Sequence, residues 1–400
     1  SVLRALAQVE NSADIDAVTT AIRAIYLPWA EESARYLQQL VDNVSYPGGT
    51  CETAKAIAFT SGDCVFFVDG LRFDAGKRLR RALEAVGLTV SEKPFWAALP
   101  SVTATGKAAV TPVRDRICGR EGSLDFEPSV ADTGQSLKGG HPLKKLLDDA
   151  GWSILDRSAV GDGQGKAWCE CGDIDHEGHN RGWKLAKHLD ALIAEITARI
   201  RELVTAGWKR VRVVTDHGWL LVPGGLPKTD LPGALTDNRW GRCAALKTGA
   251  MSEERLFPWY WNSSQYFALA DGVSCFRKGE EYTHGGLSLQ ECLTLHLTVT
   301  PGESVHVAAA IELTDVVWKG LRCTVAVDGN YAGLSLDIRS QAGNALSSVV
   351  VSSKPLKENG TASVVVEDEE LEGQEATVVL IDSQGMLLAQ YPTVIGGGDR

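Results

Sequence analysis

Two strand-like runs, each followed at once by an aspartate, constrain the fold of this chain more than any other feature. Residues 64–68 are continuously apolar, as in a central parallel strand buried on both faces, and they stop at Asp69. Residues 211–215 predict a second strand, which stops at Asp216, and a long amphipathic helix is expected before it over 183–204. Strands alternating with helices predict an α/β domain built on a mostly parallel sheet.

Other segments of the same region fit this alternation. Helices are expected over 75–86 and 141–150, and a short strand over 152–155. Residues 88–100 look extended, and 101–110 look like a loop that leads into a short helix. In open α/β sheets, ligands bind beyond the carboxyl ends of the strands. The two aspartates that end the predicted strands are therefore candidate site residues.

The length of 400 residues exceeds the roughly 250–300 that one hydrophobic core serves, so more than one domain is expected. Residues 1–48 predict a helical segment packed on the core, and 49–294 the α/β domain. After Cys292 the pattern changes to period two, beginning with the alternating stretch 293–299. We expect an all-β sandwich over 295–400. Its short strands are expected over 305–313, 324–327, 334–338, 347–352, 362–366, 376–381 and 386–391.

Charge and cysteine content limit the partners and the compartment. The net charge is −11, of which residues 301–400 carry −8, with 6 basic and 14 acidic side chains. This argues against indiscriminate coating of nucleic acid, although the nearly neutral first three quarters leave room for a local basic groove. An odd number of cysteines, nine, scattered through the chain favours a reducing cytoplasm.

Membrane and export signals are not evident in the sequence. We expect no membrane partner, because no apolar run approaches the roughly 18–20 residues of a spanning helix. The chain begins at Ser1 without a methionine or a signal-peptide pattern, so we interpret it as a fragment of a longer protein.

Aspartate and histidine gather in four short segments outside any amphipathic pattern: 67–70, 175–179, 214–218 and 282–286. Two zinc-type ions need about six or seven nitrogen and oxygen ligands, and imidazole and carboxylate both suit Zn²⁺. The inventory predicts two divalent metal ions, with zinc first and manganese or magnesium as alternatives. The candidate ligands are Asp69, Asp175, His179, Asp216, His217 and His284.

In order, residue type and position relative to strands, these motifs resemble those of the alkaline-phosphatase superfamily. The resemblance implies an alkaline-phosphatase-like fold and two ions. One ion would lie on Asp69, Thr103, Asp216 and His217, and the other on Asp175, His179 and His284. It further implies a phosphoester hydrolase in which a threonine or serine hydroxyl is the nucleophile.

More narrowly, five segments resemble the PglZ domain of bacterial BREX phage-defence systems, over roughly residues 50–292. The segments are 68–74 (VDGLRFD), 99–106 (LPSVTATG), 174–179 (IDHEGH), 215–218 (TDHG) and 283–288 (THGGLS). This resemblance implies a phosphodiesterase or nuclease that acts in antiviral defence, with DNA as a candidate substrate and other defence proteins as partners.

The nucleophile and the phosphate ligand are assigned within these segments. Thr103 is the expected nucleophile, and Thr105, two residues away, is the alternative. Arg72, three residues from Asp69, is a candidate ligand for the substrate phosphate. The signal that sulfatases need for formylglycine formation is absent from the sequence, which disfavours sulfate esters.

Several conspicuous residues have ordinary structural interpretations. Single histidines are most often satisfied core or surface side chains, and we interpret four of them so: His141, His188, His296 and His306. His176 is placed outside the metal ligands. The glycine-rich stretch 161–166 resembles a phosphate loop but is interpreted as a connecting loop. Cys169 and Cys171 lack a second pair at zinc-finger spacing.

Two alternatives to a phosphodiesterase stay open from the sequence. The first is a catalytically silent scaffold that binds partner proteins or DNA in the defence complex. The second is a phosphomonoesterase or phosphomutase of the same superfamily. A scaffold that had lost activity is expected to lose ligands, whereas all seven ligand positions are filled here.

Overall fold

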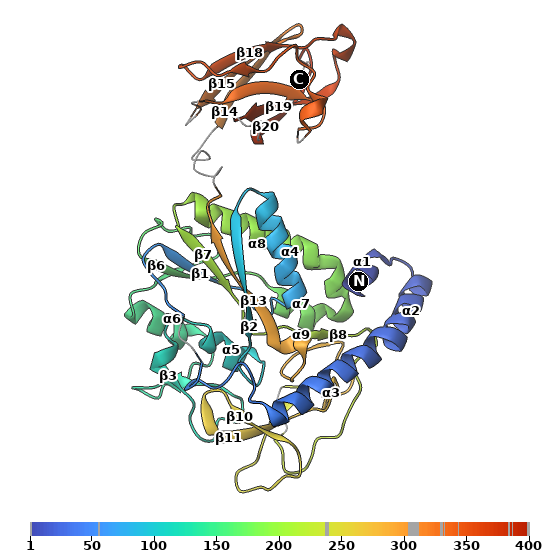
Figure 1. Cartoon of the computed structure of the whole chain (residues 1–400), viewed down its shortest axis with the longest axis vertical. Helices are drawn as coiled ribbons and strands as arrows, with labels where there is room; N and C mark the ends of the chain where they lie inside the picture. Colours follow the sequence, from blue (N-terminus) through green and yellow to red (C-terminus); the bar gives the residue numbers. More distant parts are fainter. Residues whose placement is uncertain are drawn as a thin grey trace. The chain divides into compact units, whose positions relative to one another are not determined.

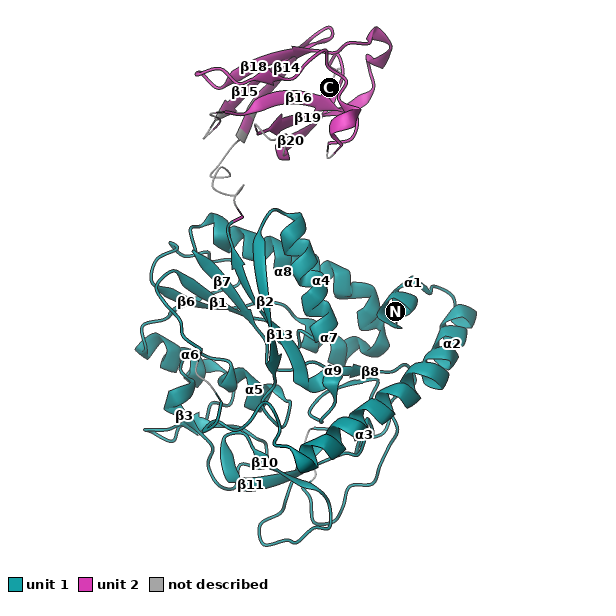
Figure 2. Cartoon of the chain, in the orientation of Figure 1, with its two compact units in different colours: residues 1–301 teal, residues 302–400 magenta. Residues whose placement is uncertain are grey.

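The structure is a computed structural model that describes residues 2–397 except for a few short gaps. The gaps are 55–56, 237–239, 303–311, 329–330, 332, 343, 383–384 and 386. The chain forms two compact units, and the boundary lies between Pro301 and Gly302 (Figure 2).

The centre of unit 1 is a six-stranded sheet in the order β2-β13-β7-β1-β6-β5. The strands are β1 (Asp63–Phe67), β2 (Thr89–Trp96), β5 (Ser153–Leu155), β6 (Lys166–Glu170), β7 (Arg210–Val214) and β13 (Leu293–Thr300). Strands β7, β1, β6 and β5 run parallel, and β13 runs antiparallel to both β2 and β7. All five residues of β1 are buried, as its continuous apolar run predicts.

Helices cover both faces of this sheet (Figure 1). On one face, α4 (Phe73–Ala85) packs on α8 (Leu185–Thr205) and on β13. On the other face, α5 (Thr103–Ala109) and α6 (His141–Asp149) share a core with Val65 and Trp168 of the sheet. The expected fold class, a mostly parallel sheet flanked by helices, is confirmed.

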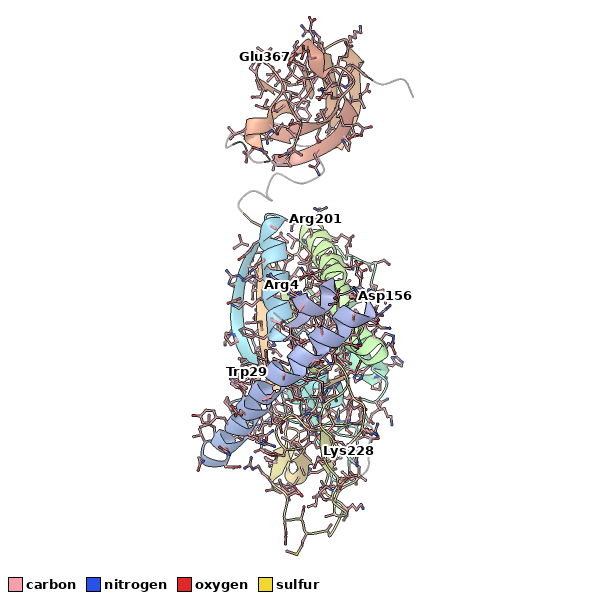
Figure 3. The ribbon with its side chains drawn as sticks, turned by 90° about the vertical axis from the view of Figure 1, so that its right-hand side faces the viewer. Arg4, Trp29, Asp156, Arg201, Lys228 and Glu367 are labelled. Atoms are coloured by element: carbon pink, nitrogen blue, oxygen red, sulfur yellow. The ribbon has the colours of Figure 1, made fainter. Side chains whose placement is uncertain are left out.

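The chain begins with α1 (Val2–Gln8), α2 (Ser12–Ala21), a π-helical turn (Ile22–Tyr26) and α3 (Leu27–Asn43). Ala30 and Ala34 of α3 are buried, in a cluster that includes strand β8 of unit 1. Other apolar residues of these helices are exposed, among them Trp29, which is 55% exposed and labelled in Figure 3. The apolar pattern of these helices is thus wider than the face that they bury.

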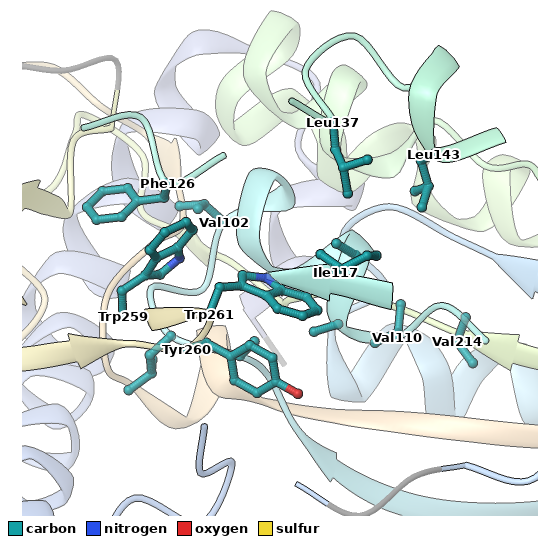
Figure 4. Close-up of a cluster of buried hydrophobic side chains, with 14 of the residues drawn as sticks. Val102, Val110, Ile117, Phe126, Leu137, Leu143, Val214, Trp259, Tyr260 and Trp261 are labelled. Atoms are coloured by element: carbon teal, nitrogen blue, oxygen red, sulfur yellow. The ribbon is translucent and has the colours of Figure 1, made fainter. Parts of the chain in front are cut away.

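Smaller elements complete unit 1 around the carboxyl ends of the parallel strands. Two of these are two-stranded antiparallel sheets: β8 (Leu220–Leu221) with β12 (Tyr282–Thr283), and β3 (Ile117–Cys118) with β4 (Ser129–Val130). A third sheet has three antiparallel strands, with β11 (Asn262–Leu269) between β10 (Leu256–Trp259) and β9 (Cys243–Ala245). The short helices are α7 (Ile174–Arg181) and α9 (Leu289–Cys292), with 3-10 turns at Arg114–Arg116 and Gly182–Lys184. Trp259 and Trp261 pack beside Val102 and Phe126 under α5 (Figure 4).

Unit 2 is a sandwich of two antiparallel sheets, as expected. One sheet is β14-β15-β18 (Glu312–Lys319, Arg322–Asp328 and Thr361–Val365), and the other is β17-β16-β19-β20 (Lys354–Pro355, Ser335–Arg339, Glu375–Ile381 and Leu387–Val394). Two 3-10 turns lie at Ala345–Ser347 and Glu369–Leu371. Residues such as Val325, Ile338, Val364 and Val378 form its core.

Among the expected strands one is wrong, one is mostly untested, and one observed strand was not expected. Residues 347–352 make only isolated bridges, through Ser348 and Val350, and form no strand. Most of the strand expected over 305–313, with His306, lies outside the described residues. Strand β6 was not expected, because the glycine-rich loop before it obscured the start of the apolar run.

The largest difference concerns the stretch 293–299, which we expected to begin the sandwich. It is β13, and it pairs with β2 on one side and β7 on the other in the central sheet. Its alternating burial, with Leu295, Leu297 and Val299 inside, fits a half-buried strand in either domain. Period two therefore identified the strand but not the sheet to which it belongs.

Among the described residues, no helix is both long enough and apolar enough for a membrane span.

Candidate metal centre

The six candidate ligands follow strands that end at one edge of the central sheet or lie against that edge. Asp69 comes after β1, and Asp216 and His217 come after the neighbouring parallel strand β7. Asp175 and His179 lie one turn apart on α7, which follows β6, and His284 follows β12. Because parallel neighbours end at the same edge, segments far apart in sequence meet here.

The first group of side chains is Asp69, Asp216 and His217, whose ligand atoms all lie within 4.8 Å of one another. His217 Nε2 lies 3.5 Å from Asp69 Oδ1 and 3.5 Å from Asp216 Oδ2. Asp216 and His217 are fully buried, whereas the Asp69 side chain is partly open to solvent.

The second group is Asp175, His179 and His284, again with ligand atoms within 4.8 Å of one another. Asp175 lies 3.5 Å from His179 Nε2 and 3.3 Å from His284 Nε2. The Tyr282 hydroxyl donates to Asp175 Oδ1 at 2.8 Å and holds this carboxylate in place. The His179 side chain is 44% exposed, so the site opens to solvent on this side.

The two groups adjoin through their buried histidines. The rings of His217 and His284 stack with centroids 3.8 Å apart and an angle of 10° between planes. Each ring donates from Nδ1 to a backbone carbonyl: His217 to Gly218 at 2.9 Å, and His284 to Ser101 at 3.1 Å. A carbonyl only accepts, so both rings carry the proton on Nδ1 and turn the Nε2 lone pair toward the carboxylates. This tautomer leaves Nε2 of each ring free to bind a metal.

The carboxylates repel one another in this buried place. Burial holds the pKa of Asp69 well above its usual value, and the negative charges of Asp216 and Asp175 add to this effect. Burial, followed by Asp175, raises the pKa of Asp216 to about 6. Burial also acts to raise the pKa of Asp175, but the surrounding imidazoles, His284 first, bring it below its usual value. Burial lowers the pKa of His179, His217 and His284, which favours neutral rings.

One atom of the site lacks a partner among the described residues. Asp216 Oδ1 accepts from the amides of Gly70 and His217, at 3.3 and 3.0 Å. Asp216 Oδ2 is buried and accepts no hydrogen bond. An orphaned carboxylate oxygen that lies 3.5 Å from an imidazole nitrogen, in one group with the Asp69 carboxylate, fits a bound cation. The donor set suits two divalent ions, one in each group.

Thr103 and Thr105 lie on different sides of α5. The Thr103 hydroxyl is 3.1 Å from His217 Nε2 and 3.4 Å from Asp69 Oδ1, inside the first group. Thr105 is fully buried, accepts from Trp259 Nε1 at 2.9 Å and donates to the carbonyl of Phe126. The structure thus brings Thr103 to the six ligands and places Thr105 against Trp259 and Phe126, which are labelled in Figure 4.

Arg72 lies elsewhere. Its guanidinium forms two hydrogen bonds with Asp74, at 2.6 and 3.0 Å, and stacks on the Trp219 ring at 3.8 Å. It also donates to the Trp219 carbonyl. The guanidinium of Arg72 is therefore bonded to Asp74 and Trp219 and is not directed at a phosphate beside Asp69.

A lysine that the sequence analysis did not single out lies at the site instead. Lys107 follows Thr103 by four residues on α5, and both lie on the same side of the helix. Lys107 Nζ bonds Glu170 at 2.8 Å and lies over the Phe67 ring at 4.8 Å. With Asp69 and Lys144 it lines a hollow of about 240 Å³. The i, i+4 spacing from the nucleophile candidate is the signal that could have identified it.

Other residues considered from the sequence remain outside the centre. His176 is exposed and bonds Asn180. No metal-binding group among the described residues includes Cys169 or Cys171. The glycine-rich stretch 161–166 connects β5 to β6, and Gly163 approaches the backbone of Gly207.

Comparison with known proteins gives only distant similarity. No protein-family model matches the chain, and no curated protein matches its sequence. Murine ectonucleotide pyrophosphatase/phosphodiesterase 5 is a structural neighbour with 11% identity and a TM-score of 0.38, over 60% of this chain and 88% of that chain. Phosphonoacetate hydrolase from Sinorhizobium meliloti 1021, with phosphonoacetate bound, has 12% identity and a TM-score of 0.36, over 59% and 89%. At these scores the function has to be argued from the site of this chain itself.

Proposed function

We propose that unit 1 is a metal-dependent phosphoester hydrolase that acts on phosphodiesters and uses Thr103 as its nucleophile. One observation carries the proposal: two groups of carboxylate and imidazole ligands adjoin beside a hydroxyl, and the buried Asp216 Oδ2 has no hydrogen-bond partner in the described part of the chain. Two-ion sites of this composition are used for phosphoryl transfer, where bound divalent ions stabilise negative charge on the attacking and leaving oxygens.

The charge of the site favours a diester over a monoester. Among the described residues, the basic side chains that contact Asp69, Asp175 and Asp216 are histidines, and burial lowers the pKa of these rings and so favours their neutral form. Three carboxylates with two divalent ions would leave a net charge of about +1. This balances the single negative charge of a phosphodiester better than the nearly double charge of a monoester.

The residues of the chain have separate tasks in such a reaction. The Thr103 hydroxyl passes its proton to Asp69 Oδ1, 3.4 Å away, as its oxygen attacks phosphorus in line. The Oγ1–phosphorus bond forms as the bond to the leaving oxygen breaks, and the leaving oxygen takes a proton from water. His217 and Asp69 hold the hydroxyl at the attacking position. Water then cleaves the phospho-threonine and restores the hydroxyl. Lys107 and Lys144 line the hollow beside Asp69, so these cations, rather than Arg72, would orient the substrate there.

Finer assignments of the function rest on the sequence resemblance. We propose membership of the alkaline-phosphatase superfamily and a PglZ-type role in bacterial phage defence, with DNA or another nucleic acid as substrate and other defence proteins as partners. We further propose zinc as the metal and the cytoplasm as the location. The division proposed is one catalytic unit that includes the N-terminal helices and extends through β13, followed by the sandwich.

The experiment that tests the function measures metal and turnover together. The purified chain is expected to hold about two divalent ions and to hydrolyse bis-p-nitrophenyl phosphate faster than p-nitrophenyl phosphate. Faster hydrolysis of the monoester would favour the phosphomonoesterase. Bound metal with no turnover of either ester, or of single- and double-stranded DNA, would favour the scaffold.

The nucleophile is tested by two substitutions on α5. Thr103→Ala is expected to keep the metal and to lower kcat at least 10²-fold, as loss of a catalytic group does. Thr105→Ala should retain most activity but lose about 1–3 kcal/mol of stability, because the buried Trp259 Nε1 loses its acceptor. Near-normal turnover in Thr103→Ala would rule out the phospho-threonine step, whereas phospho-threonine trapped from the wild type by acid quench would support it.

A further inference from the structure

A buried ion pair lies directly behind the candidate metal centre. Arg242 and Glu291 are both fully buried, and their side chains form two parallel bonds, Nε to Oε1 at 3.1 Å and Nη2 to Oε2 at 2.9 Å. Arg242 also donates to three backbone carbonyls, at Ala270, Gly272 and Ser274. Neither residue belongs to the two ligand groups.

Glu291 connects this pair to the segment that carries His284. Its Oε1 accepts from the amide of Gly286 at 2.7 Å, and its Oε2 accepts from the Ser288 hydroxyl at 2.7 Å. Arg242 packs against the same glycine so closely that a Cβ at position 286 would lie 2.6 Å from the guanidinium carbon. Both members of the pair therefore hold the backbone at Gly286, two residues after His284: Glu291 by a hydrogen bond and Arg242 by close packing.

Glu291 also holds the segment that carries His217. Its backbone carbonyl accepts from the amide of Gly218 at 2.8 Å. The carbonyl of Gly218 in turn accepts from His217 Nδ1 at 2.9 Å. The same residue thus supports the peptide that fixes the tautomer of the second buried histidine.

Ser101 extends the network to the nucleophile segment. Its hydroxyl donates to the carbonyl of Gly286 at 2.8 Å, and its own carbonyl accepts from His284 Nδ1 at 3.1 Å. Thr103 follows two residues later. Three segments that are distant in sequence, around 101–103, 217–218 and 284–286, are therefore joined around Glu291: its carboxylate holds Gly286, its backbone carbonyl holds Gly218, and Ser101 bonds Gly286.

We propose that Arg242 and Glu291 are positioning residues that hold the Thr103, His217 and His284 segments together, so that both ion sites form as one unit. The inference rests on the proposed function in taking these histidines as metal ligands. Partners of this kind orient metal ligands, and their loss typically costs 10–100-fold in metal affinity. A pair that merely stabilised the fold would have no such effect.

The chain offers a matched control for a test. Asp63 is also fully buried and paired with arginines, Arg210 and Arg212, and it accepts from the Thr60 amide at 2.8 Å. It starts β1, whereas Asp69 follows the end of that strand, about 20 Å away at the spacing of an extended chain. Asp63→Asn therefore removes a buried carboxylate charge far from the ion sites.

The test compares Glu291→Gln with Asp63→Asn in the full chain. Metal is removed with a chelator, Zn²⁺ is titrated by calorimetry, and stability is measured by urea unfolding of the metal-free protein. Glu291→Gln is expected to bind Zn²⁺ about 10–100-fold more weakly at both sites, whereas Asp63→Asn should lose stability but keep the wild-type affinity. If Glu291→Gln binds Zn²⁺ as the wild type does, the positioning role is refuted and the proposed function is untouched.

Two further measurements keep the outcomes distinct. The histidine tautomers of the metal-free chain, followed by ¹⁵N NMR, should change at His284, whose segment the Glu291 carboxylate holds, in Glu291→Gln but not in Asp63→Asn. If the wild type binds no divalent ion, the proposed function fails, and unchanged tautomers in Glu291→Gln would separately refute the positioning role. If Glu291→Gln does not fold, Ser101→Ala is the second variant. It keeps the ion pair but loses the hydrogen bond from the Ser101 hydroxyl to the Gly286 carbonyl. Unchanged Zn²⁺ affinity in Ser101→Ala would contradict the inference.

Discussion

Two fully buried carboxylates in unit 1 differ in how their oxygens are satisfied. Glu291 has partners for both oxygens, and although burial acts to raise its pKa, Arg242 and its hydrogen bonds bring that pKa below the usual value. Asp216 has one oxygen without a partner, and burial with the nearby Asp175 raises its pKa to about 6. A buried carboxylate whose oxygens all have protein partners is typical of a structural role. A buried carboxylate with an unpartnered oxygen is typical of a cation ligand. The contrast separates the supporting residue from the ligand.

His296 shows a structural histidine with a measurable consequence. Its ring stacks on Phe95 at 3.9 Å, and its enclosed Nε2 has no hydrogen-bond partner among the described residues. Burial, then Arg212, lowers its pKa to about 3. In the unfolded chain the value is about 6.5, so the unfolded state binds the proton first and stability falls as the pH drops from 6.5 toward 3.

Replacement by phenylalanine should remove this dependence. Below pH 6.5 the wild type is expected to lose stability relative to His296→Phe by about 1.4 kcal/mol per pH unit. Urea unfolding of both proteins at pH 7, 6 and 5 measures the difference. Parallel stability curves would mean that the ring gains its proton in the folded state as easily as in the unfolded state.

At the scale of elements, the close approach of α5 to Asp216 determines where Thr103 lies. A Cβ at Gly106 would lie 2.8 Å from both the Cβ and the carbonyl oxygen of Asp216. Gly106→Ala should therefore destabilise the protein by about 1–3 kcal/mol and lower activity, although alanine favours a helix by about 1 kcal/mol. Gly76→Ala on α4 is the control, because its nearest neighbour, Leu295, lies at an ordinary 3.4 Å. Urea midpoints and diester turnover measure both, and equal stabilisation by the two substitutions would contradict the close approach.

The elements also show what the sequence could and could not predict. Apolar runs and their terminal aspartates were sufficient for β1, β7 and the meeting of Asp69 with Asp216, because parallel neighbours end at one edge. The placement of β13 depends on a pairing partner about 200 residues away, which local periodicity does not record. Arg72 was misleading for a similar reason: nearness in sequence to Asp69 gave no information about Asp74 and Trp219, which hold its guanidinium.

At the scale of the whole molecule, the proposed chemistry lies within unit 1. All six ligands, Thr103 and the supporting ion pair precede Pro301. Residues 301–400 contribute none of them and carry −8 of the net charge of −11. An acidic unit adds repulsion toward a polyanionic substrate, so it is better suited to a protein partner than to DNA.

Two truncations test whether the activity of unit 1 needs β13 and whether it needs the sandwich. A chain ending at Pro301 keeps β13 and every ligand, and we expect it to fold, bind metal and hydrolyse a small diester within about twofold of the full chain. A chain ending at Leu293 loses nearly all of β13, which exposes the facing edges of β2 and β7 and removes the buried Leu295, Leu297 and Val299. That chain should aggregate or remain unfolded by circular dichroism. A soluble, active chain ending at Leu293 would show that β13 is dispensable. A folded but inactive chain ending at Pro301 would instead show that the sandwich contributes to the reaction.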